Sequence, residues 1–255
     1  MDELKTKLTA FYNKFNEDKR LDTRHGQVEY LTSMKYIREY LKPGDKIVDI
    51  GAGPGKYSLA LKSEGYDVTA VELTRPNIGK LRAKDKELKI VEANAVDLSM
   101  FDNDAFDVAI LFGPMYHIFD RNDRIRALKE AKRICKREIF VTYIMNEYAI
   151  IEYAFKDDNY QTVKDKIDED FKINDPDALF VHSRIEEIDE LNSLCGLKLI
   201  RRFASDGPTD YMRSTINAMD EDTFKAYLAF HQKTCERKEL LGASSHIVDI
   251  LIKEN

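Results

Sequence analysis

The sequence lacks the usual features of secreted, membrane-spanning and metal-binding proteins. Its longest apolar runs are far shorter than the ~18 residues needed to cross a bilayer. The first residues, Met1-Asp2-Glu3, begin a charged segment that is unlike a signal peptide. The 255-residue chain has three cysteines, which are far apart and lack metal-ligand spacing: Cys135, Cys195 and Cys235. We therefore expect a cytoplasmic protein with reduced thiols, no membrane partner and no metal site.

An excess of positive charge is also missing. The formal net charge is −6, whereas proteins that bind nucleic acids usually present a basic face to the phosphates. Lysines and arginines are mixed with acids, as in Lys84-Asp85-Lys86-Glu87, and this mixing is typical of a solvated surface. The charge pattern therefore does not favour a nucleic-acid partner.

The composition and periodicity are those of a globular α/β protein. Hydrophobic residues make up 43% and charged residues 34%, and the chain is long enough to bury a substantial core. Strand and helix patterns alternate from residue 46 to residue 144, which predicts a mostly parallel sheet with helices on both faces. The predicted strands are 46–50, 67–71, 88–92, 107–112 and 138–144, and the predicted helices are 57–64, 76–83 and 122–135.

The regions before and after this core follow other patterns. Apolar residues at helical spacing predict two helices within residues 1–40, which would form an N-terminal cap. Residues 41–145 would form the cofactor-binding core. Residues 146–255 would add the remaining strands and helical cover, with a helix over 186–194, a strand over 197–203 and a mostly helical segment over 220–253. All three regions would belong to one catalytic domain.

The most informative segment is a glycine-rich turn after the first predicted strand. Lys46-Ile47-Val48-Asp49 has a strand pattern, Gly51, Gly53 and Gly55 follow, and a helical pattern begins near Tyr57. Glycines leave the backbone bare, so a ligand can approach closely and positive φ angles are accessible. The second predicted strand ends with Glu72, whose carboxylate is suited to accept hydrogen bonds from ribose hydroxyls. Together these features predict a cofactor that contains a nucleoside.

The spacing of the motifs resembles that of class I S-adenosylmethionine-dependent methyltransferases. The G-x-G-x-G turn preceded by Asp49 resembles motif I, and Glu72 matches the ribose-binding acid. The segment 92–98 is similar to a G-D-A-x-x-L motif, with Asn94 in place of the usual Asp and Ala93 in place of Gly. The segment 106–114 resembles the fourth strand and active-site loop. The resemblance covers roughly residues 40–145 and implies a Rossmann-like fold.

The resemblance also implies the cofactor and its contacts. The expected cofactor is S-adenosylmethionine, with S-adenosylhomocysteine as product. An amide oxygen at Asn94 can accept from an adenine amino group as a carboxylate would. The implied cofactor-binding residues are Asp49, Gly51, Ala52, Gly53, Gly55, Glu72, Leu73, Asn94, Ala95, Phe112 and Gly113.

Methyl transfer needs few catalytic groups, because the cofactor supplies the reactive carbon. Positioning alone can contribute ~7–11 kcal/mol, and a base adds ~10²–10⁴-fold where the acceptor loses a proton. We expect His117, in the loop after the fourth strand, to contact the acceptor or take its proton, with Tyr116 beside it. The alternative is that His117 makes a structural hydrogen bond and Tyr116 is a pocket wall.

Further candidates for the acceptor pocket lie outside the core motifs. His25 and Tyr30 are in a polar and aromatic cluster within the N-terminal cap, and Tyr143 and Asn146 follow the fifth strand. His246 follows a run of small residues near the C-terminus. Surface, core or turn positions are the alternatives for each of them.

Three functions are compatible with the sequence. The loop Gly113-Pro114-Met115-Tyr116-His117 differs from the Asn/Asp-Pro-Pro-Tyr loop of enzymes that methylate nucleic-acid amino groups, which favours a small-molecule acceptor. Methylation of a protein or RNA is the second possibility, and a non-catalytic cofactor-binding module is the third. A nicotinamide enzyme is disfavoured because its glycine spacing differs.

Overall fold

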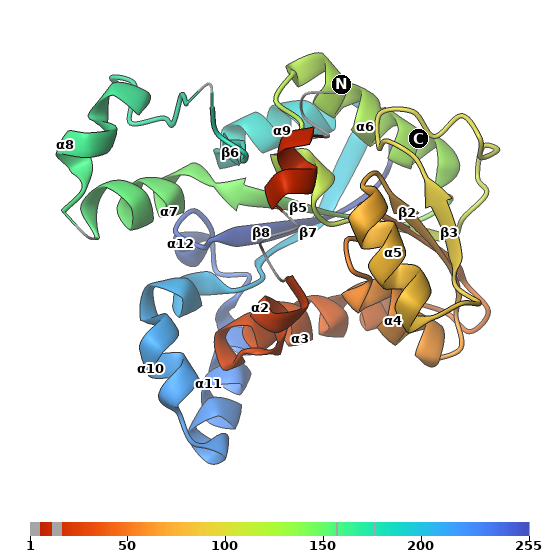
Figure 1. Cartoon of the computed structure of the whole chain (residues 1–255), viewed down its shortest axis with the longest axis horizontal. Helices are drawn as coiled ribbons and strands as arrows, with labels where there is room; N and C mark the ends of the chain where they lie inside the picture. Colours follow the sequence, from red (N-terminus) through yellow and green to blue (C-terminus); the bar gives the residue numbers. More distant parts are fainter. Residues whose placement is uncertain (1–5, 12–16, 157, 176, 255) are drawn as a thin grey trace.

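A computed structural model of the chain describes residues 6–11, 17–156, 158–175 and 177–254. Its centre is an eight-stranded sheet with strand order β3-β2-β1-β4-β5-β8-β7, and the short β6 pairs with β5 (Figure 1). The strands are β1 (Lys46–Ile50), β2 (Asp67–Glu72), β3 (Lys89–Glu92), β4 (Val108–Leu111), β5 (Ile139–Met145), β6 (His182–Ser183), β7 (Leu197–Ala204) and β8 (His246–Lys253).

Strands β1 to β5 are parallel, and the fold class predicted from the sequence is confirmed. Four of the five residues of β1 are buried, as expected for a central strand covered on both faces. The chain runs outward from β1 to β3 and then returns to place β4 on the other side of β1. Ligands of such sheets bind at this reversal, beyond the carboxyl ends of the strands.

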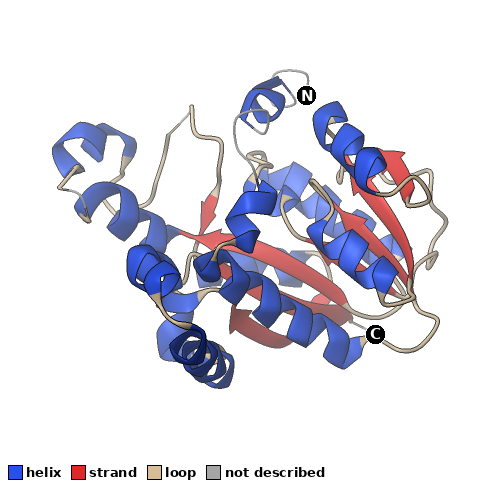
Figure 2. Cartoon of the chain, turned by 60° about the horizontal axis from the view of Figure 1, so that its bottom comes forward, coloured by secondary structure: helices blue, strands red, loops and turns tan. Residues whose placement is uncertain are grey.

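Helices lie on both sides of the sheet (Figure 2). The helices are α2 (Glu17–Asp22), α3 (Arg24–Tyr40), α4 (Lys56–Ser63), α5 (Arg75–Lys84), α6 (Arg121–Ile134), α7 (Asn146–Ile150), α8 (Tyr160–Val163), α9 (Ile185–Leu194), α10 (Arg213–Ala218), α11 (Glu221–Thr234) and α12 (Lys238–Leu241). Local signals set several of their ends. The side chain of Thr23 caps α3, and that of Asp120 caps α6. Among the helices of the described ranges, none is both long and apolar enough to cross a membrane.

The N-terminal cap is partly visible. Residues 6–11 are helical, whereas Tyr12 and Phe15 of the first predicted helix lie outside the described residues. The second predicted helix corresponds to α3, which buries Val28, Met34 and Ile37. Helix α2 packs closely on α3, since a Cβ on Gly26 would lie 2.0 Å from the carbonyl oxygen of Arg20.

The prediction of a mostly helical segment over 220–253 was wrong at its end. After α11 and α12, residues 246–253 form β8, which is antiparallel to both β5 and β7. Its β-branched and apolar residues fill a central position in the sheet, and Ile247, Val248, Ile250 and Leu251 are fully buried. The segment after β5 forms an arm of α7, the π-helix η2 (Ile151–Phe155) and α8, which projects beyond the end of the sheet (Figure 1).

Candidate functional site

The glycine turn after β1 brings backbone against a cavity. Gly51 has φ +79°, and a Cβ there would lie 2.6 Å from Cδ of Pro114 in the loop after β4. Gly53 has φ +56°, and a Cβ there would meet no atom within 4 Å. The first glycine therefore allows two loops to touch, and the second leaves open space for a ligand. Gly55 caps α4 behind the turn, against Leu81, and does not line the cavity.

Glu72 is held rigidly at the end of β2. Its Oε2 accepts a hydrogen bond from the backbone N–H of Gly53 at 2.8 Å. Its Oε1 accepts from the backbone N–H and the hydroxyl of Thr74, both at 2.7 Å. Only 5% of the residue is exposed, so the carboxylate ties the glycine turn to β2 and still borders the cavity.

Asp49, the last acid before the turn, is buried beneath it. Its Oδ2 accepts from the hydroxyl of Ser58 at 2.5 Å, so the first turn of α4 is fastened to β1. Burial raises its pKa to about 6, because the charged carboxylate loses its hydration, although the bond from Ser58 acts in the opposite direction. A cationic group bound in the cavity would stabilise the ionised form. Sequence reasoning did not identify Ser58.

The cavity has a volume of about 530 Å³ and follows the carboxyl ends of the parallel strands. Twelve of the predicted site residues line it: Asp49, Gly51, Ala52, Gly53, Glu72, Leu73, Asn94, Ala95, Phe112, Gly113, Tyr116 and His117. The structure thus brings the four sequence motifs together around one space.

One end of the cavity carries amide groups. Asn94 accepts a hydrogen bond from the N–H of Val96 through its side-chain oxygen at 3.2 Å. Asn77, near the start of α5, is buried, and its Oδ1 has no hydrogen-bond partner within the described part of the chain. A buried polar atom without a partner is costly, and a ligand donor such as an amino or hydroxyl group would satisfy it. The open space at Gly53 and this oxygen fit an adenosyl group.

His117 also lines the cavity and is buried. Burial lowers its pKa to about 4, although a hydrogen bond to the carbonyl of Leu179 acts in the opposite direction. Nδ1 donates to that carbonyl at 2.9 Å, which assigns the lone pair of the neutral ring to Nε2. Phe180 packs on the ring with centroids 5.1 Å apart. The ring is thus held in one orientation, and the lone pair of its neutral form is on Nε2.

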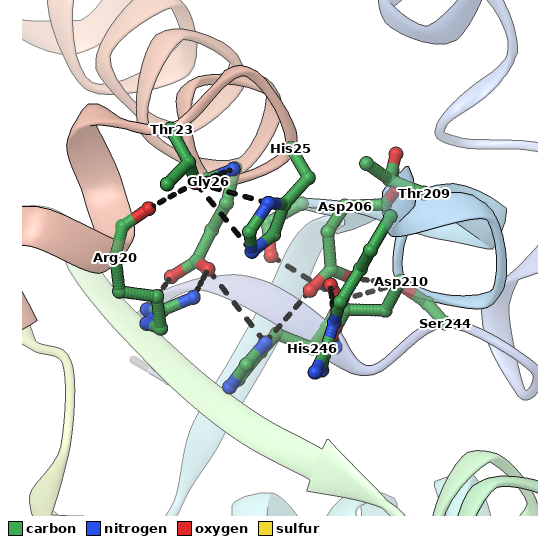
Figure 3. A network of polar contacts seen from close by, with 12 residues as sticks. Arg20, Thr23, His25, Gly26, Asp206, Thr209, Asp210, Ser244 and His246 are labelled. Atoms are coloured by element: carbon green, nitrogen blue, oxygen red, sulfur yellow. Dashed lines mark hydrogen bonds and ion pairs between the residues drawn. The ribbon is translucent and has the colours of Figure 1, made fainter. Parts of the chain in front are cut away.

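A network of ion pairs joins the N-terminal cap to β8 at the same end (Figure 3). Arg20 donates to both carboxylate oxygens of Glu29, at 2.5 and 3.1 Å. His246 Nδ1 lies 3.9 Å from Glu29 and donates to Asp206 at 2.8 Å. Asp206 also accepts from the hydroxyl of Ser244 at 2.6 Å. Arg20 and Glu29 line the cavity, so this network closes one of its sides.

The charges in this network balance each other. Burial lowers the pKa of His246, but the carboxylates of Glu29 and Asp206 outweigh it and raise the pKa to about 9. Burial raises the pKa of Glu29, but Arg20 and His246 bring it below its ordinary value. Ligand atoms of Glu29, Asp206 and His246 lie within 4.8 Å of one another. Arg20 already neutralises Glu29, so we interpret this group as an ion-pair network and not as a cation site.

The five residues predicted for the acceptor pocket do not line the cavity. His25 bonds to Asn217 at 3.1 Å on the outer side of α3, and Tyr30 packs on Tyr57 with centroids 5.4 Å apart. Tyr143 is 1% exposed within the core. Asn146 holds the arm by bonds to the backbone of Phe171 and Ile173. His246 lies in the network beside the cavity wall, as a neighbour of Tyr116.

The cavity residues that were not predicted from the sequence include Arg20, Glu29, Ser33 and Asn77. Glu29 belongs to the polar and aromatic cluster of the N-terminal cap, but from this cluster Tyr30, and not Glu29, was predicted from the sequence to line the acceptor pocket. Adjacent helical residues point about 100° apart, and here Glu29 faces the cavity while Tyr30 packs on Tyr57. Arg20 and Asn77 have no sequence signal that distinguishes them from surface residues.

Comparison with known proteins agrees with this geometry. Residues 48–141 match a family model described as a methyltransferase domain. The chain carries a methyltransferase domain. Two solved structures show the same fold, with TM-scores of 0.58 each. A methyltransferase from Methanosarcina mazei is 20% identical and is aligned over 86% of this chain and 97% of its own. A possible histamine N-methyltransferase from Thermotoga maritima is 21% identical, with 96% and 98% aligned.

The curated relatives of this methyltransferase domain have diverse names. A demethylmenaquinone methyltransferase from Clavibacter sepedonicus is 37% identical over 98 residues, which are 36% of this chain and 40% of the relative. An eEF1A lysine and N-terminal methyltransferase homolog from Drosophila melanogaster is 27% identical over 128 residues, 48% of this chain and 19% of the relative. The chain therefore spans less than half the length of these relatives.

Proposed function

We propose that the protein transfers a methyl group from S-adenosylmethionine to a small-molecule acceptor. The observation that carries this proposal is the cavity of about 530 Å³, in which the cofactor motifs occupy one part of the wall. Residues of the N-terminal cap, including Arg20, Leu21 and Glu29, cover another part. A cavity that is partly covered by these helices fits a compact acceptor better than an extended polymer.

The residues divide into a cofactor set and an acceptor set. Glu72 would accept from ribose, Asn94 and Asn77 would contact the adenine end, and Asp49 would stabilise the cationic methionine end. When bound, the cofactor supplies a methyl group on a sulfonium, and a neutral thioether leaves. Tyr116 and His117 would border the acceptor, because they lie in the loop after β4 where it meets the cap.

His117 would act as the proton acceptor. The acceptor's lone pair forms the new bond to the methyl carbon, while the electron pair of the carbon–sulfur bond stays on sulfur. Nε2 of His117 would take the proton that the acceptor loses, because Nδ1 donates to the carbonyl of Leu179 and the basic lone pair is therefore on Nε2. Such proton transfer contributes ~10²–10⁴-fold to rate.

Labelled cofactor tests this function. The protein would be incubated with S-adenosylmethionine carrying a tritiated methyl group and with separate small-molecule, RNA and protein fractions of a cell extract. We expect label in the small-molecule fraction and release of S-adenosylhomocysteine, both reduced in Glu72→Gln. Label in RNA or protein would contradict the acceptor class and support methylation of a polymer, which the names of some relatives include. Cofactor binding without label transfer to any fraction would indicate a non-catalytic module.

We also infer a cytoplasmic location. The support is the state of the cysteines, since all three are buried and free of disulfides.

A further inference from the structure

A second cavity lies next to the first, at the base of the projecting arm. Its volume is about 400 Å³, and its wall is formed by residues of α7, η2 and α8, by Lys166 and Ile167, and by residues within 173–175 and 177–182. Ten of its fifteen lining residues are apolar or aromatic: Ala149, Ile150, Tyr153, Ala154, Val163, Ile167, Ile173, Ala178, Leu179 and Phe180. The part of the wall on η2 is a π-helix, an irregularity that is frequent at functional sites.

Five of the fifteen lining residues of this second cavity are polar: Asn159, Lys166, Asp175, Asp177 and His182. Lys166 and Asp175 pair with each other at 2.8 Å, and the lysine side chain is 53% exposed. His182 lies in the wall, and its Nδ1 is buried with no hydrogen-bond partner in the described ranges. Burial lowers the pKa of His182 to about 4, so the ring is neutral at pH 7. The lining therefore suits an uncharged, mostly apolar group that carries one hydrogen-bonding atom.

Exposed apolar side chains gather on the same arm. Ile151, Phe155 and Phe171 are each between 42% and 51% exposed, and Tyr153 of the cavity wall is 53% exposed. Soluble proteins rarely expose several large apolar side chains on one element without a partner or ligand. Of these side chains Tyr153 lines the second cavity, so the exposed apolar surface and the cavity meet at this residue.

The two cavities share a wall. Ala178 lines both of them, and Leu179 and Phe180 line the second. The carbonyl of Leu179 accepts the bond from His117 Nδ1, and the N–H of Val181 donates to the carbonyl of Tyr116 at 2.8 Å. The segment 178–181 thus contacts Tyr116 and His117 and also lines the second cavity.

We propose that the second cavity binds an uncharged, largely apolar portion of the methyl acceptor, with His182 Nδ1 hydrogen-bonded to a polar atom of that portion. The proposal rests on the proposed function, since it assigns a substrate class to the same enzyme. The acceptor would be an elongated amphipathic molecule, with its reactive group near His117 and its apolar portion beyond Ala178.

A single introduced tryptophan measures occupancy, because the sequence contains none. Tyr153→Trp places the reporter in the wall of the second cavity, and Phe230→Trp places it at a 55% exposed site on α11 as a matched control. The probes are straight-chain alcohols from 1-hexanol to 1-decanol. We expect saturable fluorescence changes in Tyr153→Trp alone, with affinity rising about fourfold for each added methylene. Non-saturable changes, or equal changes in both variants, would overturn the proposal.

A pair of ligands tests the role of His182. In the Tyr153→Trp background, His182→Phe keeps an aromatic ring but removes the nitrogen. We expect weaker binding of 4-propylphenol, by about 2- to 10-fold, and unchanged binding of propylbenzene. An unaltered melting temperature confirms that the variant folds. Equal effects on the two ligands would contradict the assigned hydrogen bond.

Two further measurements separate this proposal from the proposed function. If S-adenosylmethionine binds but the alcohols do not, the second site fails and the proposed function stands. If the alcohols bind and the cofactor does not, the proposed function fails and with it the assignment of the occupant. When both bind, saturating 1-octanol should reduce label transfer to the small-molecule fraction without weakening cofactor affinity. Undiminished transfer would contradict the claim that the occupant is the acceptor.

Discussion

Replacement of Glu72 by glutamine separates its structural and binding roles. The carboxylate has about four lone-pair positions, and three accept bonds from Gly53 and Thr74, so one remains for a ribose hydroxyl. In Glu72→Gln the amide NH₂ must face one of these donors. We expect a loss of about 1–3 kcal/mol in the free energy of unfolding, because that buried donor is left without an acceptor.

The same change should weaken cofactor binding beyond its effect on stability. A hydrogen bond to a charged group contributes about 1.5–3 kcal/mol, so the Kd for S-adenosylmethionine should rise about 10- to 150-fold. Calorimetry measures the affinity and urea denaturation the stability. Glu92→Gln is the matched control, since Glu92 ends the neighbouring strand in register with Glu72 but does not line the cavity. Affinities within twofold of the parent in Glu72→Gln would refute the ribose assignment.

Three other predictions concern the ion-pair network, the glycine turn and the loop after β4. The pKa of His246 is raised from 6.5 to about 9 by two carboxylates that outweigh its burial, so its stabilisation is complete below pH 6.5 and disappears as pH rises through 9. Protonated His246 therefore contributes roughly 3 kcal/mol to the free energy of unfolding. Equal urea midpoints for the parent and His246→Gln at pH 6 would contradict this contribution. Gly51→Ala should destabilise the protein and abolish cofactor binding, because the added Cβ would clash with Pro114. Gly65→Ala is the control, since Gly65 has φ +95° and open space around it, so that this change adds only backbone strain of about 1–3 kcal/mol. Equal urea midpoints for the two variants would refute the clash. His117→Ala should leave the Kd of the cofactor within twofold and reduce turnover about 10²–10⁴-fold, and parental turnover would leave His117 a structural residue.

The parallel core could be predicted from the sequence because its signals are local. Each of the first five strands was placed within one residue of its observed ends, since short apolar runs are bounded by glycine, proline or charged residues. The cofactor motifs could be found for the same reason. Glycines and an acid at strand ends are adjacent in sequence to the elements that position them.

Strand β8 could not be predicted, because its partners are distant in sequence. Asp249 interrupts the apolar run of residues 246–253, and the pattern of this segment therefore fits a helix as well as a strand. In the structure this carboxylate is fully buried and accepts bonds from Arg202 at 2.5 and 2.8 Å and from Asn192 at 2.8 Å. These contacts come from β7 and α9, so the compensation for a buried charge exists only in the folded chain.

The acceptor side of the site was only partly accessible to sequence reasoning. His117 and Tyr116 were found because they follow a recognisable strand. Arg20 and Glu29 were missed because a charged residue in a helix is usually exposed, and only the packing of α2 and α3 shows that they face the cavity. The second cavity depends on the arm after β5, for which the sequence gives no clear periodicity.

Calorimetric titration with S-adenosylmethionine tests the central claim most directly, with S-adenosylhomocysteine and NAD as comparisons. The geometry of the glycine turn, Glu72 and the two amides predicts micromolar binding of both adenosyl compounds and no binding of NAD. Failure of both adenosyl compounds to bind would contradict the assigned cofactor site, and the catalytic role of His117 would have to be abandoned with it.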